Sequence, residues 1–408
     1  PSLTARQTGA GSCNILRALI AAVIYVVLGA ADLQGQLRDV SAYYFNAASA
    51  AGSSPVRDAS VSDFQRIRLM WAPDIGPLSF DIAYEQALTL SSTGELGRSS
   101  AFLAPQARVN WWTLEWMLDE GDHFSWRHRF DRLSFTLPLG GATETTVGRQ
   151  VISWASTLIF TPADPFTPFE PADPFREYRA GVDAFRFQVY PGAFSEIDIV
   201  VRPVTTLDGD QITALARGKM NWRGWDLGAW GGILYDEPAA AIDAVGALGP
   251  WAVRSEVSVR SEADNVTIRG TVGIDRRFSV GRRDLYVIAE YQHDGFGAAS
   301  SDQLFDVVQA DPFQRGELQV LSRDVAALQA SYQIHPLWGI DLLTLTSLVD
   351  GSFLLSGGAT WSVGSNSTLR GGVFLGFGDD IIDPETGVLE SEFGAQPNVG
   401  YVSLSHFF

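Results

Sequence analysis

Two neighbouring stretches decide the fold: 251-WAVRSEVSVR-260 and 266-VTIRGTVGID-275. Apolar and polar residues alternate in both: Val257 and Val259 fall on one face of the chain, and Glu256 and Ser258 fall on the other. A period of two residues is that of a β-strand with one apolar and one polar face. The residues SEADN between the stretches are typical of a tight turn, so the pair is predicted to form a β-hairpin.

Both predicted strands have about ten residues, the length that crosses a bilayer at a tilt of about 45°. Strands of soluble proteins usually have about five or six residues. The same alternation recurs at 78–88, 181–190, 225–235, 285–292, 326–334, 353–363 and 369–377. The sequence therefore predicts an all-β fold, a transmembrane antiparallel β-barrel. A large soluble β-sandwich or propeller is the alternative.

The predicted connections differ in length. Residues 335–337 and 364–366 are tight turns, whereas 294–322 and 379–397 are long and acidic. Outer-membrane barrels have short periplasmic turns and long outer loops. Counting back from the C-terminus gives about seventeen strands and a weaker one near 36–45; because the total is even in single-chain bacterial barrels, we expect eighteen strands, with sixteen as the alternative. A barrel of this size encloses a water-filled channel.

The chain ends with 399-VGYVSLSHFF-408. This strand resembles the assembly signal at the end of bacterial outer-membrane β-barrels, with Val402, Leu404 and Phe408 on the expected face. His406 departs from the pattern, since that position usually holds an aromatic or aliphatic residue. The resemblance implies insertion by the barrel-assembly machinery into the bacterial outer membrane, among its lipid and lipopolysaccharide.

The N-terminal residues 1–31 are predicted to be a cleaved signal peptide. Arg6 and Arg17 precede an apolar run that ends in small residues before Asp32. The run is too short to span a bilayer as a helix. The single Cys, Cys13, is removed with it, so the mature barrel, 32–408, has no disulfide. Because the chain opens with Pro1, the true start of the protein is left open.

One segment breaks the strand pattern. Residues 162–176, PADPFTPFEPADPFR, carry Pro at every third position and repeat PADPF. Polyproline II has three residues per turn, so a rod is predicted with a proline face, an Ala/Phe face and a charged face. Its backbone lacks internal hydrogen bonds and cannot lie in lipid, so 153–180 is predicted to lie in or near the lumen. An ordered loop outside the membrane, or a binding site for a partner, is the alternative.

Charges on this segment and on the barrel wall are predicted to line the pore and its constriction. The residues concerned are Asp164, Glu170, Asp173, Arg149, Arg179, Arg186, Arg254, Glu256, Arg260 and Arg269. Acids of the rod facing wall arginines would create a transverse field, as in general porins. Counting strands places the segment on the periplasmic side. Residues 148–150, Trp154 and 162–185 together resemble a pattern in uncharacterised porin-like outer-membrane proteins, which implies no particular solute.

Other function classes lack support. The net charge of −18 argues against nucleic-acid binding, which needs clustered basic residues. His123 and His128 have neither metal-site nor triad spacing, and no enzyme activity or resident cofactor is expected. The acidic loop is suited to loose Ca²⁺ or Mg²⁺ binding, or to bridging lipopolysaccharide through such ions. Its residues are Asp379, Asp380, Asp383, Glu385, Glu390 and Glu392.

The sequence as a whole predicts a porin through which small hydrophilic solutes or ions diffuse passively. The alternative is an outer-membrane barrel that acts in export, envelope assembly or adhesion through its loops and the proline-rich segment.

Overall fold

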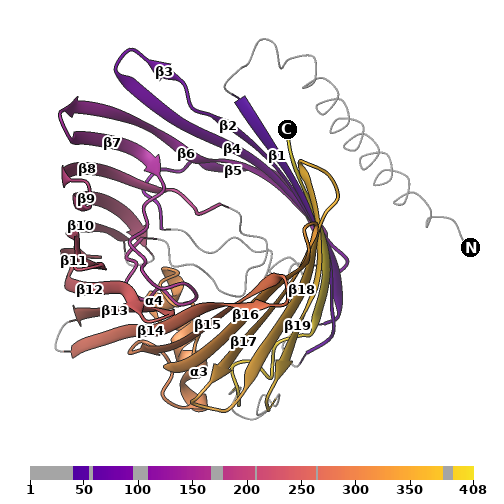
Figure 1. The fold of residues 1–408 in the computed structure, drawn as a ribbon. Coiled ribbons are helices and arrows are strands. Elements are labelled where there is room, and N and C mark those ends of the chain that lie inside the picture. The colour runs from indigo at the N-terminus through magenta and orange to yellow at the C-terminus, as the bar shows by residue number, and fades with distance from the viewer. Residues whose placement is uncertain are drawn as a thin grey trace, which may run out of the picture.

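The chain forms a closed barrel (Figure 1). A computed structural model describes residues 40–54, 58–94, 109–166, 178–206, 209–262, 265–379 and 389–408. The first strand, β1 (Val40–Ala51), pairs with β2 on one side and with the last strand, β20 (Val399–Phe407), on the other. Tyr43 lies opposite Phe407, and Ala51 lies opposite Val399. This pairing joins the two ends of the sheet, so the wall has no open edge.

Eighteen of the 20 strands form the wall. They are β1, β2 (Ser60–Trp71), β4 (Leu78–Ser91), β6 (Phe124–Gly140), β7 (Thr143–Gln150), β8 (Val182–Gly192), β9 (Ser195–Thr206), β10 (Gly209–Trp222), β11 (Trp225–Leu234), β12 (Glu237–Leu248), β13 (Trp251–Glu262), β14 (Asn265–Val280), β15 (Arg283–Asp294), β16 (Asp324–His335), β17 (Trp338–Ser347), β18 (Phe353–Ser362), β19 (Ser367–Phe377) and β20. The short strands β3 (Asp74–Ile75) and β5 (Glu115–Gly121) each pair with one wall strand, β4 and β6 respectively. The prediction of eighteen strands is confirmed, and β1 is the weak strand expected near the N-terminus. The predicted signal peptide lies outside the described residues.

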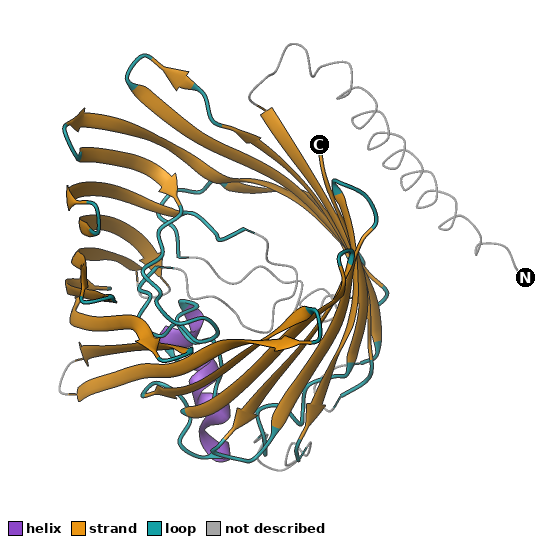
Figure 2. Cartoon of the chain, in the orientation of Figure 1, coloured by secondary structure: helices purple, strands orange, loops and turns teal. Residues whose placement is uncertain are grey.

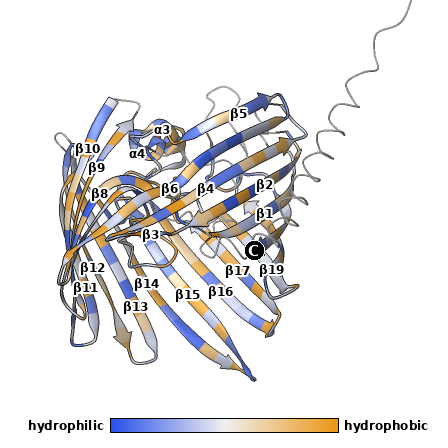
Figure 3. Cartoon of the chain, turned by 90° about the horizontal axis from the view of Figure 1, so that it is seen from above, coloured by the Kyte–Doolittle hydropathy of each residue, from blue (hydrophilic) through white to orange (hydrophobic). Residues whose placement is uncertain are grey.

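Hydrophilic and hydrophobic residues alternate along the strands (Figure 3), and the two faces of the wall differ in chemistry. In the hairpin β13–β14, the outward side chains Val257 and Ile268 are 41% and 52% exposed, whereas the inward Glu256 and Arg269 are 1% and 7% exposed. Burying charge inside and exposing apolar side chains outside is the reverse of a soluble core, and it suits a wall surrounded by lipid. The alternation thus agrees with the prediction, and a soluble sandwich or propeller is excluded.

The two rims also differ. The short-turn rim carries tight turns such as 141–142, 249–250 and 336–337, and β1 begins and β20 ends there. The long-loop rim carries the connections 92–123, 151–181, 295–323 and 378–398. Because β7 starts at the short-turn rim, the segment that follows it leaves from the long-loop rim. The expectation that the proline-rich segment lies on the periplasmic side is therefore wrong, because one miscounted strand reverses the side.

Helical structure is confined to the connection 295–323 in the part of the chain that is described (Figure 2). It consists of η1 (Ser301–Gln303), α3 (Leu304–Gln309) and α4 (Asp311–Gln314). Leu304 and Val307 of α3 pack with Ala298 and Leu318 of the same connection. Among the described helices, none is long and apolar enough to cross a membrane.

Candidate functional site in the barrel lumen

Segment 151–166, which follows β7, turns into the lumen (Figure 2). Near the end of β7, Gly148 has a φ of +119°, and a Cβ there would lie 2.3 Å from the Leu133 carbonyl oxygen on β6, so this position requires glycine. Within the lumen the Trp154 ring contacts Phe166 of the same segment and Trp230 of β11, at ring distances of 4.8 and 6.2 Å. Both tryptophans and Phe166 are buried, so this segment is a packed part of the interior.

Two wall carboxylates bind the backbone of this segment. Glu256 of β13 is 1% exposed and Glu290 of β15 is 4% exposed. Glu256 accepts hydrogen bonds from the backbone N–H of Ser156 (3.0 Å), Thr157 (3.4 Å) and Ala163 (3.0 Å). Glu290 accepts them from Leu158 (2.7 Å), Ile159 (2.9 Å) and Phe160 (2.9 Å). Donors that would otherwise be buried without partners are thereby satisfied by charged acceptors, which form the stronger class of hydrogen bond.

The first PADPF copy, residues 162–166, forms a turn in which the Asp164 N–H donates to the Thr161 carbonyl (3.1 Å). The Asp164 carboxylate is buried and accepts hydrogen bonds from Ser153 Oγ (2.8 Å) and Arg179 Nη1 (3.2 Å). The charge of Asp164 is neutralised by Arg179, so Asp164 does not face an open channel. Residues 162–166 form a turn instead of the extended polyproline II rod that the sequence predicts. Glu170, Asp173 and the second PADPF lie outside the described residues.

The other predicted pore arginines pair with carboxylates of neighbouring strands. Arg149 forms a bidentate pair with Asp183 on β8, at 2.7 and 2.8 Å, and also donates to the Trp112 carbonyl. Two further pairs are Arg186 with Asp198 (2.6 Å) and Arg254 with Asp275 (2.8 Å). Among the three arginines predicted to oppose the rod, Arg179 is therefore the one that meets Asp164.

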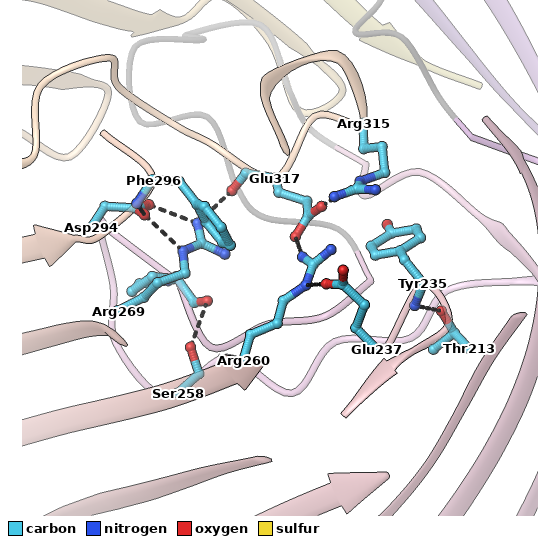
Figure 4. Close-up of polar contacts among 11 residues, drawn as sticks. Thr213, Tyr235, Glu237, Ser258, Arg260, Arg269, Asp294, Phe296, Arg315 and Glu317 are labelled. Carbon is cyan, nitrogen blue, oxygen red and sulfur yellow. Dashed lines mark hydrogen bonds and ion pairs between the residues drawn. The ribbon is translucent and has the colours of Figure 1, made fainter. Parts of the chain in front are cut away.

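Arg260 and Arg269 belong to a stack of cations and aromatic rings (Figure 4). The Arg260 guanidinium carbon lies 5.4 Å from the Tyr235 ring and 5.4 Å from the Phe296 ring. The Arg269 guanidinium carbon lies 5.5 Å from the same Phe296 ring, and that of Arg315 lies 4.7 Å from the Tyr235 ring. Cations over aromatic rings attract through the ring quadrupole, more strongly when desolvated.

Carboxylates complete this stack. Glu317 accepts from Arg260 (2.7 Å) and Arg315 (2.8 Å), and Asp294 forms a bidentate pair with Arg269 at 2.9 and 2.7 Å. Phe296, Arg315 and Glu317 come from the connection 295–323, whereas Arg260 and Arg269 belong to the wall. The stack therefore holds the long connection inside the barrel. Sequence reasoning missed Tyr235, Phe296, Arg315 and Glu317, because no local pattern marks contacts between residues so distant in the chain.

A second group of charges lies on the wall of β2, β4 and β6. Arg68 is fully buried and forms ion pairs with Glu85 and with Asp131, the latter at 2.8 Å. Its guanidinium also lies 4.4 Å from the Tyr178 ring. Arg66, one inward position along, lies within 6.0 Å of the rings of Tyr43, Phe45 and Phe64. The inner face is thus also charged on the side of β2, β4 and β6, where Arg68 is paired with two carboxylates.

The short-turn end of the lumen contains a pocket of about 640 Å³. It lies between the turn after β14 and the turn after β16, and Arg277, Tyr286, Ser331 and Asp341 contribute to its lining. This end of the barrel therefore has a hollow large enough for a small solute.

The acidic outer loop is only partly described. Glu392 is buried, and its carboxylate accepts hydrogen bonds from the backbone N–H of Leu321 (2.7 Å) and Ser322 (2.9 Å). It thus joins the connection 378–398 to 295–323. Asp380, Asp383 and Glu385 lie outside the described residues. Where side chains are described, no cluster of three or more His, Cys, Asp or Glu is arranged to hold a metal ion.

Glu392 predicts a pH dependence of this outer-loop contact. Burial raises the pKa of Glu392, and the Asp350 carboxylate adds to the shift. The contribution of Glu392 to the stability of the contact between the two connections is therefore fully present below the pKa of a glutamate in the unfolded chain, about 4.3. It is lost as the pH rises through the raised pKa of Glu392 in the folded protein. We expect faster hydrogen exchange of the Leu321 and Ser322 amides at pH 8 than at pH 5, after correction for the intrinsic rate. In Glu392→Gln that pH difference should vanish, and an unchanged difference would contradict this assignment.

The last strand is placed as its pattern requires. Val402 and Leu404 point outward and are 53% and 37% exposed. The Phe408 N–H donates to the Ala42 carbonyl of β1 (2.9 Å), and the His406 ring lies 4.4 Å from the Phe408 ring. The role of these residues in assembly stays a prediction.

No protein-family model and no curated protein matches the sequence. Solved structures do match. OpdK of Pseudomonas aeruginosa, solved with vanillate, has a TM-score of 0.53 and 10% identity, covering 91% of this chain and 99% of that one. A BenF-like porin of Pseudomonas fluorescens Pf-5 has a TM-score of 0.52 and 12% identity, covering 91% and 98%. Wzi of Escherichia coli, a carbohydrate-binding barrel involved in capsule assembly, has a TM-score of 0.51 and 10% identity, covering 93% and 87%.

The chain therefore has the fold of outer-membrane porins. Its apolar outer face and this shared fold place the barrel in the bacterial outer membrane.

Proposed function

We propose that the protein is a channel through which small hydrophilic solutes or ions diffuse passively across the outer membrane. The observation that carries this proposal is the attachment of segment 151–166 to one side of the lumen by Glu256 and Glu290. Eighteen strands enclose a lumen wide enough to hold water, and a loop bound along one wall narrows it. The charged inner face suits polar solutes.

Conductance tests this proposal. Purified protein in a planar lipid bilayer is expected to give steady open steps that scale with salt concentration. Folding is checked independently by heat-modifiable migration in electrophoresis. Silent bilayers with correctly folded protein would overturn the proposal.

A second candidate is a non-conducting barrel that acts in export, envelope assembly or adhesion through its outer loops. One apolar cluster favours it, because Tyr43 and Phe45 of the wall pack in the same cluster as the loop residues Ile159, Phe160 and Phe393. Such a cluster fills part of the lumen. Wzi, which shares the fold, is described as a carbohydrate-binding barrel. Silent bilayers together with retention on a polysaccharide column would favour this candidate.

Two partner contacts belong to either function. The barrel-assembly machinery would insert the protein through Val402, Leu404 and Phe408, and lipopolysaccharide would contact the acidic outer loop, directly or through Ca²⁺ or Mg²⁺. Neither function involves catalysis.

A further inference from the structure

The turn between β14 and β15 concentrates positive charge at the short-turn rim. Arg276 and Arg277 lie near the end of β14, Arg282 lies in the turn 281–282, and Arg283 begins β15. This contrasts with the chain as a whole, whose net charge is −18. Short turns face the periplasm in outer-membrane barrels, so this cluster faces the periplasm.

The four arginines face two environments. Arg276 lies next to the outward Ile274–Val272 side of β14, and its guanidinium lies 5.3 Å from the Trp251 ring and 4.7 Å from the Phe278 ring. That arrangement is typical of a residue at the lipid interface. Arg277 follows the inward Asp275 by two positions and lies 5.4 Å from the Tyr286 ring. It therefore belongs to the lumen side.

Arg277, Arg282 and Arg283, which we call the inner-rim arginines, line the pocket of about 640 Å³. Arg277 and Arg282 are exposed, and neither forms an ion pair with a carboxylate of the described chain. Arg283 donates to the Gln333 carbonyl across the pocket (3.4 Å). The patch is therefore hydrated and accessible.

The neighbouring carboxylates leave this charge uncompensated. Asp275 is held by Arg254 (2.8 Å) and by the Tyr286 hydroxyl (2.8 Å). Asp341 in the pocket wall pairs with Arg370 (2.7 Å). Asp284 is the remaining acid in the pocket lining and opposes three arginines. The pocket thus carries a net positive charge.

The shape of the pocket indicates the kind of occupant. Sites for small molecules usually enclose most of the ligand surface and place a few buried polar groups around it. Here the polar groups are exposed and stand on a rim between two turns, 281–282 and 336–337. Such a surface suits a protruding segment of a macromolecule. Complementary charge would also set the orientation of docking, because like charges elsewhere on an acidic protein repel.

We propose that the inner-rim arginines dock an acidic segment of a periplasmic protein. The partner would present Asp or Glu side chains that enter the pocket and pair with Arg277 and Arg282. The interaction does not depend on whether the barrel conducts.

A binding experiment tests the proposal on the whole barrel in nanodiscs of neutral phosphatidylcholine, which leave both rims accessible. The probe is a fluorescein-labelled decapeptide of alternating Glu and Ser, with the Gln–Ser decapeptide as the neutral control. Fluorescence anisotropy at low salt is expected to show saturable binding of the acidic peptide alone. The variant Arg277→Gln/Arg282→Gln should weaken it about tenfold, because two charge-assisted contacts are lost.

The matched variant is Lys219→Gln/Arg223→Gln. Both residues are exposed and lie at the short-turn rim on the β10–β11 hairpin, so this variant removes the same charge from the same rim. Its binding should equal that of the parent protein. If both variants weaken peptide binding equally, the proposal is overturned, because nonspecific attraction by positive charge on the rim would then explain the binding.

Two further outcomes would also overturn it. In the first, citrate displaces the peptide at a citrate concentration equal to that of the peptide, with the ionic strength held constant. The pocket would then be a binding site for a small anion. If replacing part of the phosphatidylcholine with phosphatidylglycerol abolishes peptide binding, lipid headgroups occupy the patch. Each of these experiments measures binding, so its failure is distinguishable from failure of the proposed channel function.

Discussion

Replacing both Glu256 and Glu290 with Gln is expected to turn one steady conductance level into fluctuations between several levels, with the largest above the parent value. Each glutamate accepts three backbone hydrogen bonds from segment 156–163. Gln keeps the size of the side chain and one acceptor oxygen but loses the charge. A hydrogen bond to a charged group contributes about 1.5–3 kcal/mol, against about 1 kcal/mol for a neutral pair. Weakening six such bonds together should release the segment from the wall part of the time.

Glu144→Gln provides the control. Glu144 lies on β7 near the short-turn rim and accepts a hydrogen bond from the Tyr190 hydroxyl (2.9 Å), away from the inserted segment. The Glu144→Gln variant removes a negative charge without changing a contact to the backbone of segment 151–166, so the variant should keep a single conductance level. Hydrogen exchange of amides 156–160 reports on the loop directly. A double variant with parental amide protection and a single conductance level would show that the two glutamates do not hold the segment.

The wall could be predicted from the sequence because strand periodicity is local. Val257 and Ser258 are adjacent, and lipid and lumen impose opposite chemistry on adjacent positions of a strand. The even strand number also followed from local counting, and the pairing of β1 with β20 bears it out. The direction of each strand proved harder, since a single miscounted strand moved the proline-rich segment to the wrong rim.

The interior could not be predicted in the same way. Glu256 reads in the sequence as one polar residue of an inward face, yet it binds a segment about a hundred positions away. The three-residue periodicity of proline in 162–176 predicts that Asp164 lies on the charged face of a rod. Proline fixes φ but does not prevent the turn that brings the Asp164 N–H to Thr161. Ser258 likewise faces inward but is covered, since its hydroxyl lies 3.4 Å from the Pro162 carbonyl.

Replacing Leu328 with Arg is expected to lower the free energy of unfolding in lipid vesicles by about 2–4 kcal/mol, the cost of a charge on the lipid face near the bilayer midplane. Leu328 is 52% exposed on the outer face of β16. It lies between two outward tyrosines, Tyr291 towards the long-loop rim and Tyr332 towards the short-turn rim. Interfacial aromatic residues mark the two edges of the apolar band, so Leu328 lies well inside that band.

Ser331→Arg is the matched change on the same strand. Ser331 faces the lumen and lines the open pocket at the short-turn end, where a guanidinium stays in water. The free energy of unfolding of the Ser331→Arg variant should stay within about 0.5 kcal/mol of the parent value, as for an ordinary surface substitution. A slip of one residue in the register would exchange the two faces and reverse the two results. Urea titrations of both variants in the same vesicles measure the difference, and equal destabilisation of the two would contradict the assignment of lipid and lumen faces on β16.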